Sequence, residues 1–195
     1  MYINPEPKFG SIFICYFHSV TPINTGNGFL LYNKYFEVLI PFRGLFYKSI
    51  FDPDDFEIIK KYTWHYHSPR NNEEGYAETT ENNKEIDMHR MLMKIYCAIK
   101  DNEIVDHINR NKLDNRKLNL RICTQAQNLR NREKSNCRKF SSKYKGVWRT
   151  PNNKWVAEIR PNRKKIICGR FDSEIEAALA YNEAAKKYFG EFACL

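Results

Sequence analysis

Short apolar runs separated by turn residues predict several strands and short helices in the first half of the chain. The run YFEVLIPFRGLFYKSIF, residues 35–51, predicts two strands around a turn at 41–44. Residues 52–62 predict a short helix, because Asp52 suits the N-cap position and Pro53 suits the first turn. This region therefore begins with a hairpin that leads into a helix.

The next residues predict a second hairpin and a second helix. Runs with strand character at 63–67 and 75–80 flank an Asn-rich turn, and a helix is expected to begin near His89. Residues 1–34 receive no assignment, because their Pro- and Gly-containing pattern shows no clear periodicity.

A strand-strand-helix unit follows. Residues 105–108 predict a brief strand, 109–116 a polar turn and 118–123 a returning strand. Thr124 is a suitable N-cap for a helix that reaches about residue 134. This unit is the most polar part of the predicted fold.

The last third of the chain predicts a separate module. Residues 130–143 hold six basic residues and one acidic residue without apolar periodicity, which indicates a basic linker. Three strand-like runs then precede a helix with Asp172 as its expected N-cap. The predicted fold class is α+β: a strand-strand-helix unit with N-terminal strands and a short helix, then a three-stranded antiparallel sheet packed on one helix. The predicted divisions are 1–34, 35–129, 130–143 and 144–195.

Charge is distributed unequally along the chain. The formal net charge is +9, and residues 101–195 hold 21 basic and 11 acidic side chains. A basic half of this kind favours a polyanionic partner or an acidic membrane surface, and it places the binding surface in the second half. The chain is expected to be monomeric, and no obligate protein partner is evident.

The cysteines and the apolar stretches indicate where in the cell the protein is expected. Six cysteines occur without a C-x-x-C pair, which favours reduced thiols over a zinc site or a disulfide framework. The apolar stretch at 9–20 is too short to span a bilayer and lacks the features of a signal peptide. An intracellular location, in the cytoplasm or nucleoid, without export or membrane insertion is therefore expected.

An acid and a histidine stand side by side in the strand-strand-helix unit. Hydrolysis of a phosphodiester needs a base to activate water and a cation to neutralise charge. His107 is a candidate base, and Asp106 offers a hard oxygen ligand suited to magnesium or manganese. Asn119 follows His107 by 12 positions and is placed to fix the imidazole tautomer, and Asn128 follows by 21 positions and can face Asp106.

These residues resemble the HNH endonucleases of the ββα-metal class, particularly the homing enzymes of mobile elements. The matching motifs are Asp106-His107, the NLR of residues 119–121, and Gln127-Asn128. The resemblance implies His107 as general base, Asp106 and Asn128 as ligands of a divalent metal, and Asn119 as the residue that orients His107. The third histidine of the family is replaced by Asn128, as is common in the homing branch.

An isolated Asp-His pair in a polar loop ordinarily has no catalytic role, so the nuclease hypothesis depends on both asparagines. The other histidines are expected to have no catalytic role. His89 and Arg90 are expected to be structural or to contact phosphate, and His65 and His67 are expected to be ordinary strand residues.

The basic C-terminal module offers the side chains of a DNA-binding sheet. Its blocks YKGV, AEIR, GRF and AALAYNEAA resemble the plant Apetala-two/ERF DNA-binding domain over residues 142–193. The resemblance implies binding of double-stranded DNA. The side chains expected to contact DNA are Arg130, Arg132 and Arg138 in the linker, and Lys145, Trp148, Arg149, Lys154, Glu158, Arg160 and Lys165 in the sheet.

Some positions depart from the plant pattern. Trp148, Thr150, Asn152 and Ile167 stand where the plant domain has Arg, Arg, Trp and Trp, so the target sequence does not carry over. For Arg149, Lys154 and Arg163, a solvated position is as plausible as a phosphate contact. Core packing is expected of a further set: Trp155, Phe171, Ala177, Ala178, Ala180 and Tyr181.

Together the patterns predict a metal-dependent DNA endonuclease of the HNH homing type whose site is selected partly by the C-terminal domain. The alternative is a non-catalytic DNA-binding regulator with a vestigial nuclease unit. An RNA-binding protein ranks last, because no RNA-type signature is present.

Overall fold

The computed structural model of the protein describes residues 30–31, 35–68, 74–134 and 141–195. The chain divides into two compact units, Met1–Ile122 and Cys123–Leu195, which are described separately. The division falls inside the predicted 35–129 domain, at the end of the second strand of its strand-strand-helix unit.

The first unit opens with an antiparallel sheet in the order β1 (Leu30–Leu31), β2 (Phe36–Phe42) and β3 (Leu45–Phe51). The β2–β3 turn consists of Arg43 and Gly44, which have φ values of 50° and 78°. Positive φ at both positions is typical of two-residue hairpins, whose twist matches that of the strands. The predicted hairpin is confirmed, with a turn two residues shorter than expected.

The predicted short helix forms as a 3₁₀ turn, η1 (Pro53–Asp55), followed by α1 (Phe56–Ile59). Asp52 occupies the N-cap position, but its side chain makes no capping hydrogen bond. Instead Asp52 Oδ2 accepts the Lys117 backbone N–H at 2.6 Å. The Asp52 carboxylate therefore binds the polar segment between strands β7 (Ile104–His107) and β8 (Leu120–Cys123).

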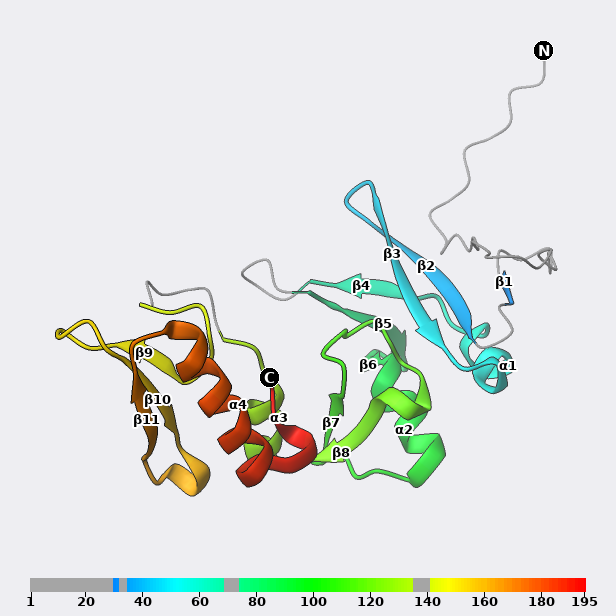
Figure 1. The fold of residues 1–195 in the computed structure, drawn as a ribbon. Coiled ribbons are helices and arrows are strands. Elements are labelled where there is room, and N and C mark those ends of the chain that lie inside the picture. The colour runs from blue at the N-terminus through cyan, green and yellow to red at the C-terminus, as the bar shows by residue number, and fades with distance from the viewer. Residues whose placement is uncertain (1–29, 32–34, 69–73, 135–140) are drawn as a thin grey trace, which may run out of the picture. The chain divides into compact units, whose positions relative to one another are not determined.

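A second sheet has the order β4 (His65–His67), β5 (Tyr76–Glu81) and β6 (Lys84–Asp87), and Figure 1 shows it beside the first hairpin. Strand β6 was not predicted, because its sequence KEID holds only one apolar residue. It pairs with β5 across Asn82 and Asn83, both at positive φ, which asparagine tolerates better than most residues. Helix α2 (Met88–Cys97) follows directly.

Helix α2 joins the two hydrophobic clusters of the first unit. Met88 and Leu92 pack with Phe51 and Trp64 in the cluster beneath the sheets. Met93 packs in a smaller cluster with three further side chains, those of Ile99, Val105 and Leu120. Val105 and Leu120 belong to β7 (Ile104–His107) and β8 (Leu120–Cys123), which pair with each other. Helix α2 therefore packs against both the sheets and the β7–β8 pair.

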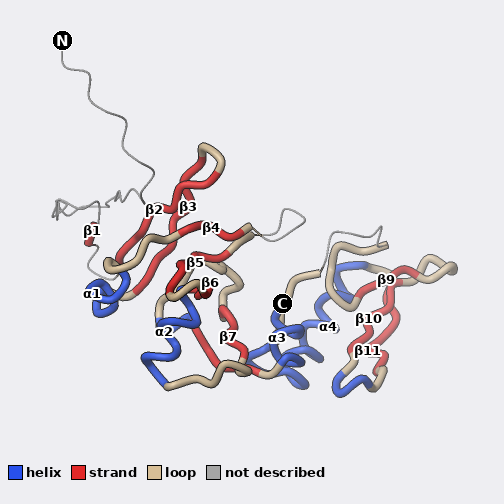
Figure 2. The backbone as a smooth tube through the Cα atoms, turned by 180° about the vertical axis from the view of Figure 1, so that it is seen from behind, coloured by secondary structure: helices blue, strands red, loops and turns tan. Residues whose placement is uncertain are grey.

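The second unit contains α3 (Gln125–Asn131), the sheet β9 (Val147–Arg149), β10 (Trp155–Ile159) and β11 (Ile166–Phe171), and α4 (Glu174–Phe189). Strand β10 is central and pairs antiparallel with both neighbours. Helix α4 packs on this sheet, as Figures 1 and 2 show. The predicted three-stranded sheet backed by one helix is confirmed.

The core of the second unit is where the sequence placed it. Ala177, Ala178 and Tyr181 of α4 are buried, and Trp155, Phe171 and Ala180 pack against them. The N-cap of α4 is Ser173, whose Oγ accepts the Ile175 N–H, and not the predicted Asp172, which instead forms an ion pair with Lys154. Both units mix helices with small antiparallel sheets, in agreement with the α+β class. Within the residues described, no helix has the length and apolarity needed to cross a bilayer.

Candidate functional site

The segment between β7 and β8 is bound to strand β3. Ile50 donates its N–H to the Leu113 carbonyl at 2.8 Å, and its own carbonyl accepts the Asn115 N–H at 2.8 Å. Ser49 Oγ donates to the Leu113 carbonyl at 3.2 Å. These bonds between residues far apart in the sequence fix a polar segment that has few apolar contacts of its own.

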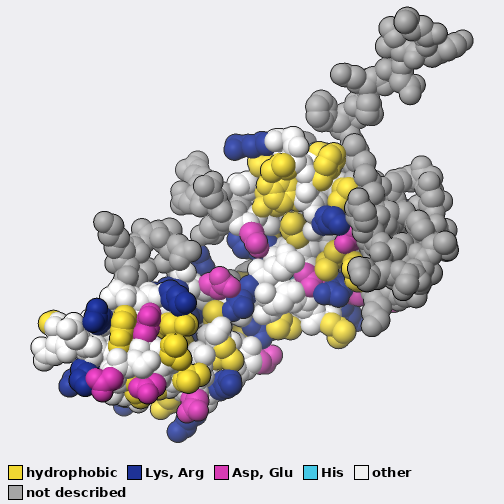
Figure 3. Space-filling model, turned by 45° about the horizontal axis from the view of Figure 1, so that its top comes forward, with side chains coloured by type: hydrophobic (Ala, Val, Ile, Leu, Met, Phe, Trp, Pro, Cys, Tyr) yellow, Lys and Arg dark blue, Asp and Glu magenta, His cyan; other side chains and the backbone are white. Residues whose placement is uncertain are grey.

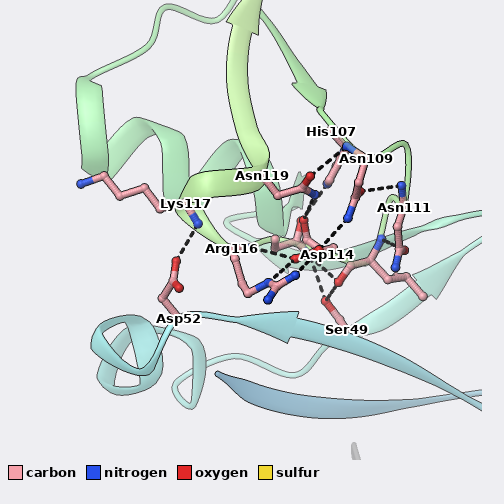
Figure 4. A network of polar contacts seen from close by, with 11 residues as sticks. Ser49, Asp52, His107, Asn109, Asn111, Asp114, Arg116, Lys117 and Asn119 are labelled. Carbon is pink, nitrogen blue, oxygen red and sulfur yellow. Dashed lines mark hydrogen bonds and ion pairs between the residues drawn. The ribbon is translucent and has the colours of Figure 1, made fainter. Parts of the chain in front are cut away.

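Asp114 is the centre of the polar network in Figure 4. Its buried carboxylate accepts hydrogen bonds from Asn109 Nδ2 at 2.7 Å and from Arg116 Nε and Nη2 at 2.8 and 2.7 Å. Burial raises the pKa of this carboxyl, but the Arg116 and Asn109 bonds outweigh that effect and lower it. Asp114 is therefore an ionised anchor for the segment.

His107 lies at the end of β7 and is buried, with its Nε2 atom 3.1 Å from Asn115 Oδ1. Asn115 Nδ2 donates to Ser49 Oγ at 2.8 Å, so the amide oxygen is the atom that faces the imidazole. An amide oxygen accepts a hydrogen bond but cannot donate one. His107 therefore carries its proton on Nε2, which leaves Nδ1 with the lone pair that a base requires.

The environment of His107 keeps the ring neutral. Burial lowers its pKa, although the Asn115 bond and the charges of Asp106 and Asp114 oppose this. His89 packs edge-on against His107, with ring centroids 5.0 Å apart, and burial sets its pKa well below the usual value. His89 is thus a buried structural residue. Its neighbour Arg90 donates to the carbonyls of residues 101 and 103, which favours the structural one of the two roles expected of it.

Asn119 has neighbours other than the one predicted for it. Its Oδ1 accepts the Asn109 N–H at 2.9 Å, and its Nδ2 donates to the Asp114 carbonyl at 2.7 Å. Both bonds brace the backbone of the β7–β8 connection. The hydrogen bond that fixes the tautomer of His107 comes from Asn115, a residue that the sequence analysis did not single out.

Asp106 is buried on β7 beside Arg121 of β8. Arg121 Nε and Nη2 both donate to Asp106 Oδ2, at 2.9 and 2.7 Å. A carboxylate oxygen is a hard donor of the kind that magnesium and manganese prefer. Among the residues described, no cluster of three or more His, Cys, Asp or Glu side chains is placed to hold a metal. A site here would therefore combine Asp106 with neutral oxygen ligands such as amides or water.

Asn128 lies in the middle of α3, in the second unit. This helix begins with a complete capping box: Thr124 Oγ1 accepts the Gln127 N–H, and Gln127 Oε1 accepts the Thr124 N–H at 2.8 Å. The predicted N-cap is confirmed, although the helix ends at Asn131 rather than near residue 134. The side-chain amide of Asn128 can supply a neutral oxygen ligand, and its convergence with Asp106 stays a prediction.

Lysine side chains attach α3 to the rest of the second unit. Lys145 Nζ donates to the Arg130 carbonyl at 2.7 Å and to the Arg132 carbonyl, at the C-terminal end of α3. Lys134 Nζ donates to the carbonyls of Ser142 and Tyr144, at 2.9 and 2.8 Å. Cations are favourable at a helix C-terminus, where carbonyls lack partners. Lys145, predicted to contact DNA, thus has a structural role in the fold.

The exposed side chains of the β9–β11 sheet form a mixed surface. Trp148 is 38% exposed, and Lys165 Nζ lies 6.0 Å from the centre of its ring. Glu158 accepts hydrogen bonds from Arg160 at 2.6 Å and Lys165 at 2.9 Å. Burial raises the pKa of Glu158, but these two cations outweigh it and lower the pKa. On the face drawn in Figure 3, basic side chains of this unit lie among acidic and apolar ones.

The other basic residues predicted to contact DNA are distributed around this surface. Arg130 lies over the Phe189 ring at 4.7 Å, Arg149 lies over Trp155 at 5.5 Å, and Lys154 pairs with Asp172. Arg132 is exposed, and Arg138 lies outside the described residues.

A cleft of about 1090 Å³ between α3 and the sheet is lined by Arg130, Lys145, Trp148, Arg160 and Lys165, among others. Glu158 lines the cleft as well, so six of the predicted DNA contacts line one concave surface.

The packing of the second unit requires glycine at position 146, in the YKGV block. It has a φ of 68°, and a Cβ atom there would lie 2.1 Å from the Tyr181 ring and 2.6 Å from the Glu158 carbonyl. Only glycine fits this position without displacing the packing between the sheet and α4.

Comparisons with known proteins identify both parts of the chain. The family model described as HNH endonuclease matches residues 89–130, and the model described as AP2 domain matches residues 142–191. A protein of Acanthamoeba polyphaga mimivirus, named as an uncharacterized HNH endonuclease, is 32% identical over 183 residues, which cover 91% of this chain and 89% of that protein. The chain belongs to the HNH endonuclease family and carries an AP2 domain.

Plant proteins match the AP2 domain alone. The dehydration-responsive element-binding protein 2D of Arabidopsis thaliana is 54% identical over 52 residues, covering 26% of this chain and 25% of that protein. Protein 2A of the same name from Oryza sativa is 47% identical over 60 residues, covering 30% and 20%. No solved structure shows significant similarity to the chain. HNH and AP2 domains together indicate a nuclease that binds DNA.

Proposed function

We propose that the protein is a homing-type endonuclease that cuts phosphodiester bonds of double-stranded DNA in a metal-dependent reaction. The observation that carries this proposal is the state of His107, a neutral, buried imidazole held by Asn115 beside the acidic Asp106. The match of residues 89–130 to the HNH endonuclease family supports a catalytic role for this histidine. The homing type itself is inferred from the sequence resemblance.

In the proposed reaction, His107 accepts a proton from water at Nδ1, and the resulting hydroxide attacks the phosphorus in line with the departing 3′ oxygen. Asn115 holds Nε2–H throughout and stabilises the imidazolium that forms. Asn119 supports this arrangement through the segment that it braces. General base catalysis of this kind is typically worth ~10²- to 10⁴-fold in rate.

The divalent cation, magnesium or manganese, would be held by Asp106 and Asn128. When bound, it supplies positive charge at the phosphate and the leaving oxygen. The donor set fits such an ion, because carboxylate and amide oxygens are hard ligands.

The AP2 domain would select the cleavage site in part. Six of its proposed contacts line the cleft, namely Arg130, Lys145, Trp148, Glu158, Arg160 and Lys165. The others are Arg149 of β9, Lys154 of the turn before β10, and Arg132 and Arg138 of the predicted linker. Phosphate contacts would fix the position of the duplex, and a few base contacts would specify the sequence.

The competing hypothesis is a DNA-binding regulator that has lost catalysis. Digestion of fragmented DNA from the source genome, in parallel reactions with magnesium, with manganese and with EDTA, distinguishes the two. The nuclease hypothesis expects discrete products that require the metal. Site-specific binding without any metal-dependent product would favour the regulator.

A further inference from the structure

Both side chains of the Asp106–Arg121 ion pair are largely buried. The Arg121 side chain is 10% exposed and the Asp106 side chain 7% exposed. Both donors of Arg121 meet the same carboxylate oxygen, Oδ2, at 2.9 and 2.7 Å. A carboxylate removed from water is stabilised by a positive partner, and Arg121 supplies one to Asp106.

A second Arg–Asp pair in the same unit provides a comparison. Arg116 binds both oxygens of Asp114, and its side chain is 36% exposed. That pair anchors a loop, and Asp114 is not expected to bind any other cation. The two pairs share the same chemical groups, but only Asp106 is a proposed metal ligand.

We propose that Arg121 is a positioning residue that competes with the metal ion for the Asp106 carboxylate, an inference that rests on the proposed role of Asp106 as a ligand. Two cations on one carboxylate repel each other, more strongly in a buried site than in water. A divalent ion must therefore displace Arg121 from Oδ2 or bind against its charge. Metal affinity of the DNA-free protein is weak for this reason.

A displaced Arg121 would still need an anionic partner, because an unpaired buried guanidinium is strongly unfavourable. The phosphodiester substrate offers one whose oxygens match the guanidinium fork. Arg121 would thus exchange Asp106 for the substrate when metal and DNA are both bound, which makes the two binding events mutually favourable.

Manganese binding to the full chain without DNA tests the competition, with free Mn²⁺ followed by electron paramagnetic resonance. Arg121→Gln is expected to bind Mn²⁺ about tenfold or more tightly than the wild type, because a positive charge is removed. Arg121→Lys keeps the charge and should stay within about threefold of the wild type, and the matched control Arg116→Gln should not change the affinity. Equal or weaker binding by Arg121→Gln would overturn the proposal.

A nuclear magnetic resonance measurement on the wild type covers the case in which Arg121→Gln does not fold. Titration with Mg²⁺ should shift the Arg121 Nε–Hε resonance and leave that of Arg116 in place. An unmoved Arg121 resonance under Asp106-dependent Mg²⁺ binding would overturn the competition. If Asp106→Asn binds metal as well as the wild type does, the proposed ligand role fails instead, and the two failures are thereby distinguished.

Discussion

Asn115 offers the sharpest test of how the site is organised. Its side chain is 1% exposed and bonds His107 at 3.1 Å and Ser49 at 2.8 Å. Replacement by alanine leaves two buried polar groups without these partners, at about 1–3 kcal/mol each, so the free energy of unfolding should fall by roughly 2–6 kcal/mol. Loss of the fixed tautomer should also reduce single-turnover DNA cleavage by about 10²-fold or more.

Asn115→Asp separates catalysis from folding. It keeps the shape of the side chain and places a negative charge beside the imidazole, which raises the pKa of His107. The acid limb of the cleavage pH profile should then move to higher pH than in the wild type. Asn111→Ala, in the same segment, is the control and should leave the profile in place. Wild-type rate and pH profile in both Asn115 variants would refute the assigned role.

Three further predictions concern pH, packing and DNA binding. Burial lowers the pKa of His89 below 6.5, so the unfolded chain binds a proton first as pH falls, and stability present above pH 6.5 is lost below it. Between pH 7.5 and 5.5, the free energy of unfolding of His89→Phe should therefore fall by up to about 1.4 kcal/mol less than that of the wild type, as measured by urea unfolding. An equal fall in both proteins would count against this. Lys145→Met removes the cation from the end of α3 and should lower the free energy of unfolding by about 1–3 kcal/mol, whereas an unchanged urea midpoint would exclude this structural role of Lys145. Arg160→Ala should weaken DNA binding and reduce the slope of log affinity against log salt by about one, and an unchanged slope would remove Arg160 from the phosphate contacts.

The sequence predicted elements whose pattern is local and strongly periodic. The β2–β3 hairpin, the N-cap at Thr124 and the core positions of α4 follow from neighbouring residues, and all are present. Strand β6 escaped prediction because its formation depends on pairing with β5 and not on its own apolar content.

Residue type alone singles out Asp106 and His107, whose roles as ligand and base stay predictions, but it does not reveal their supporting contacts. Asn115 and Arg121 are explained only by the fold: Asn115 reaches His107 because β3 binds the loop, and Arg121 meets Asp106 because their strands pair. Polar loops give no periodic signal, so sequence reasoning assigned the orienting role to Asn119.

The central claim is that His107 is the base of a metal-dependent nuclease. Single-turnover cleavage of supercoiled plasmid DNA in magnesium, by the wild type and His107→Ala at matched DNA occupancy, tests it most directly. The wild type should convert the plasmid to nicked or linear product, and EDTA should stop it. His107→Ala should bind DNA with unchanged affinity and cleave at least ~10²-fold more slowly. Cleavage by His107→Ala at the wild-type rate would contradict the claim.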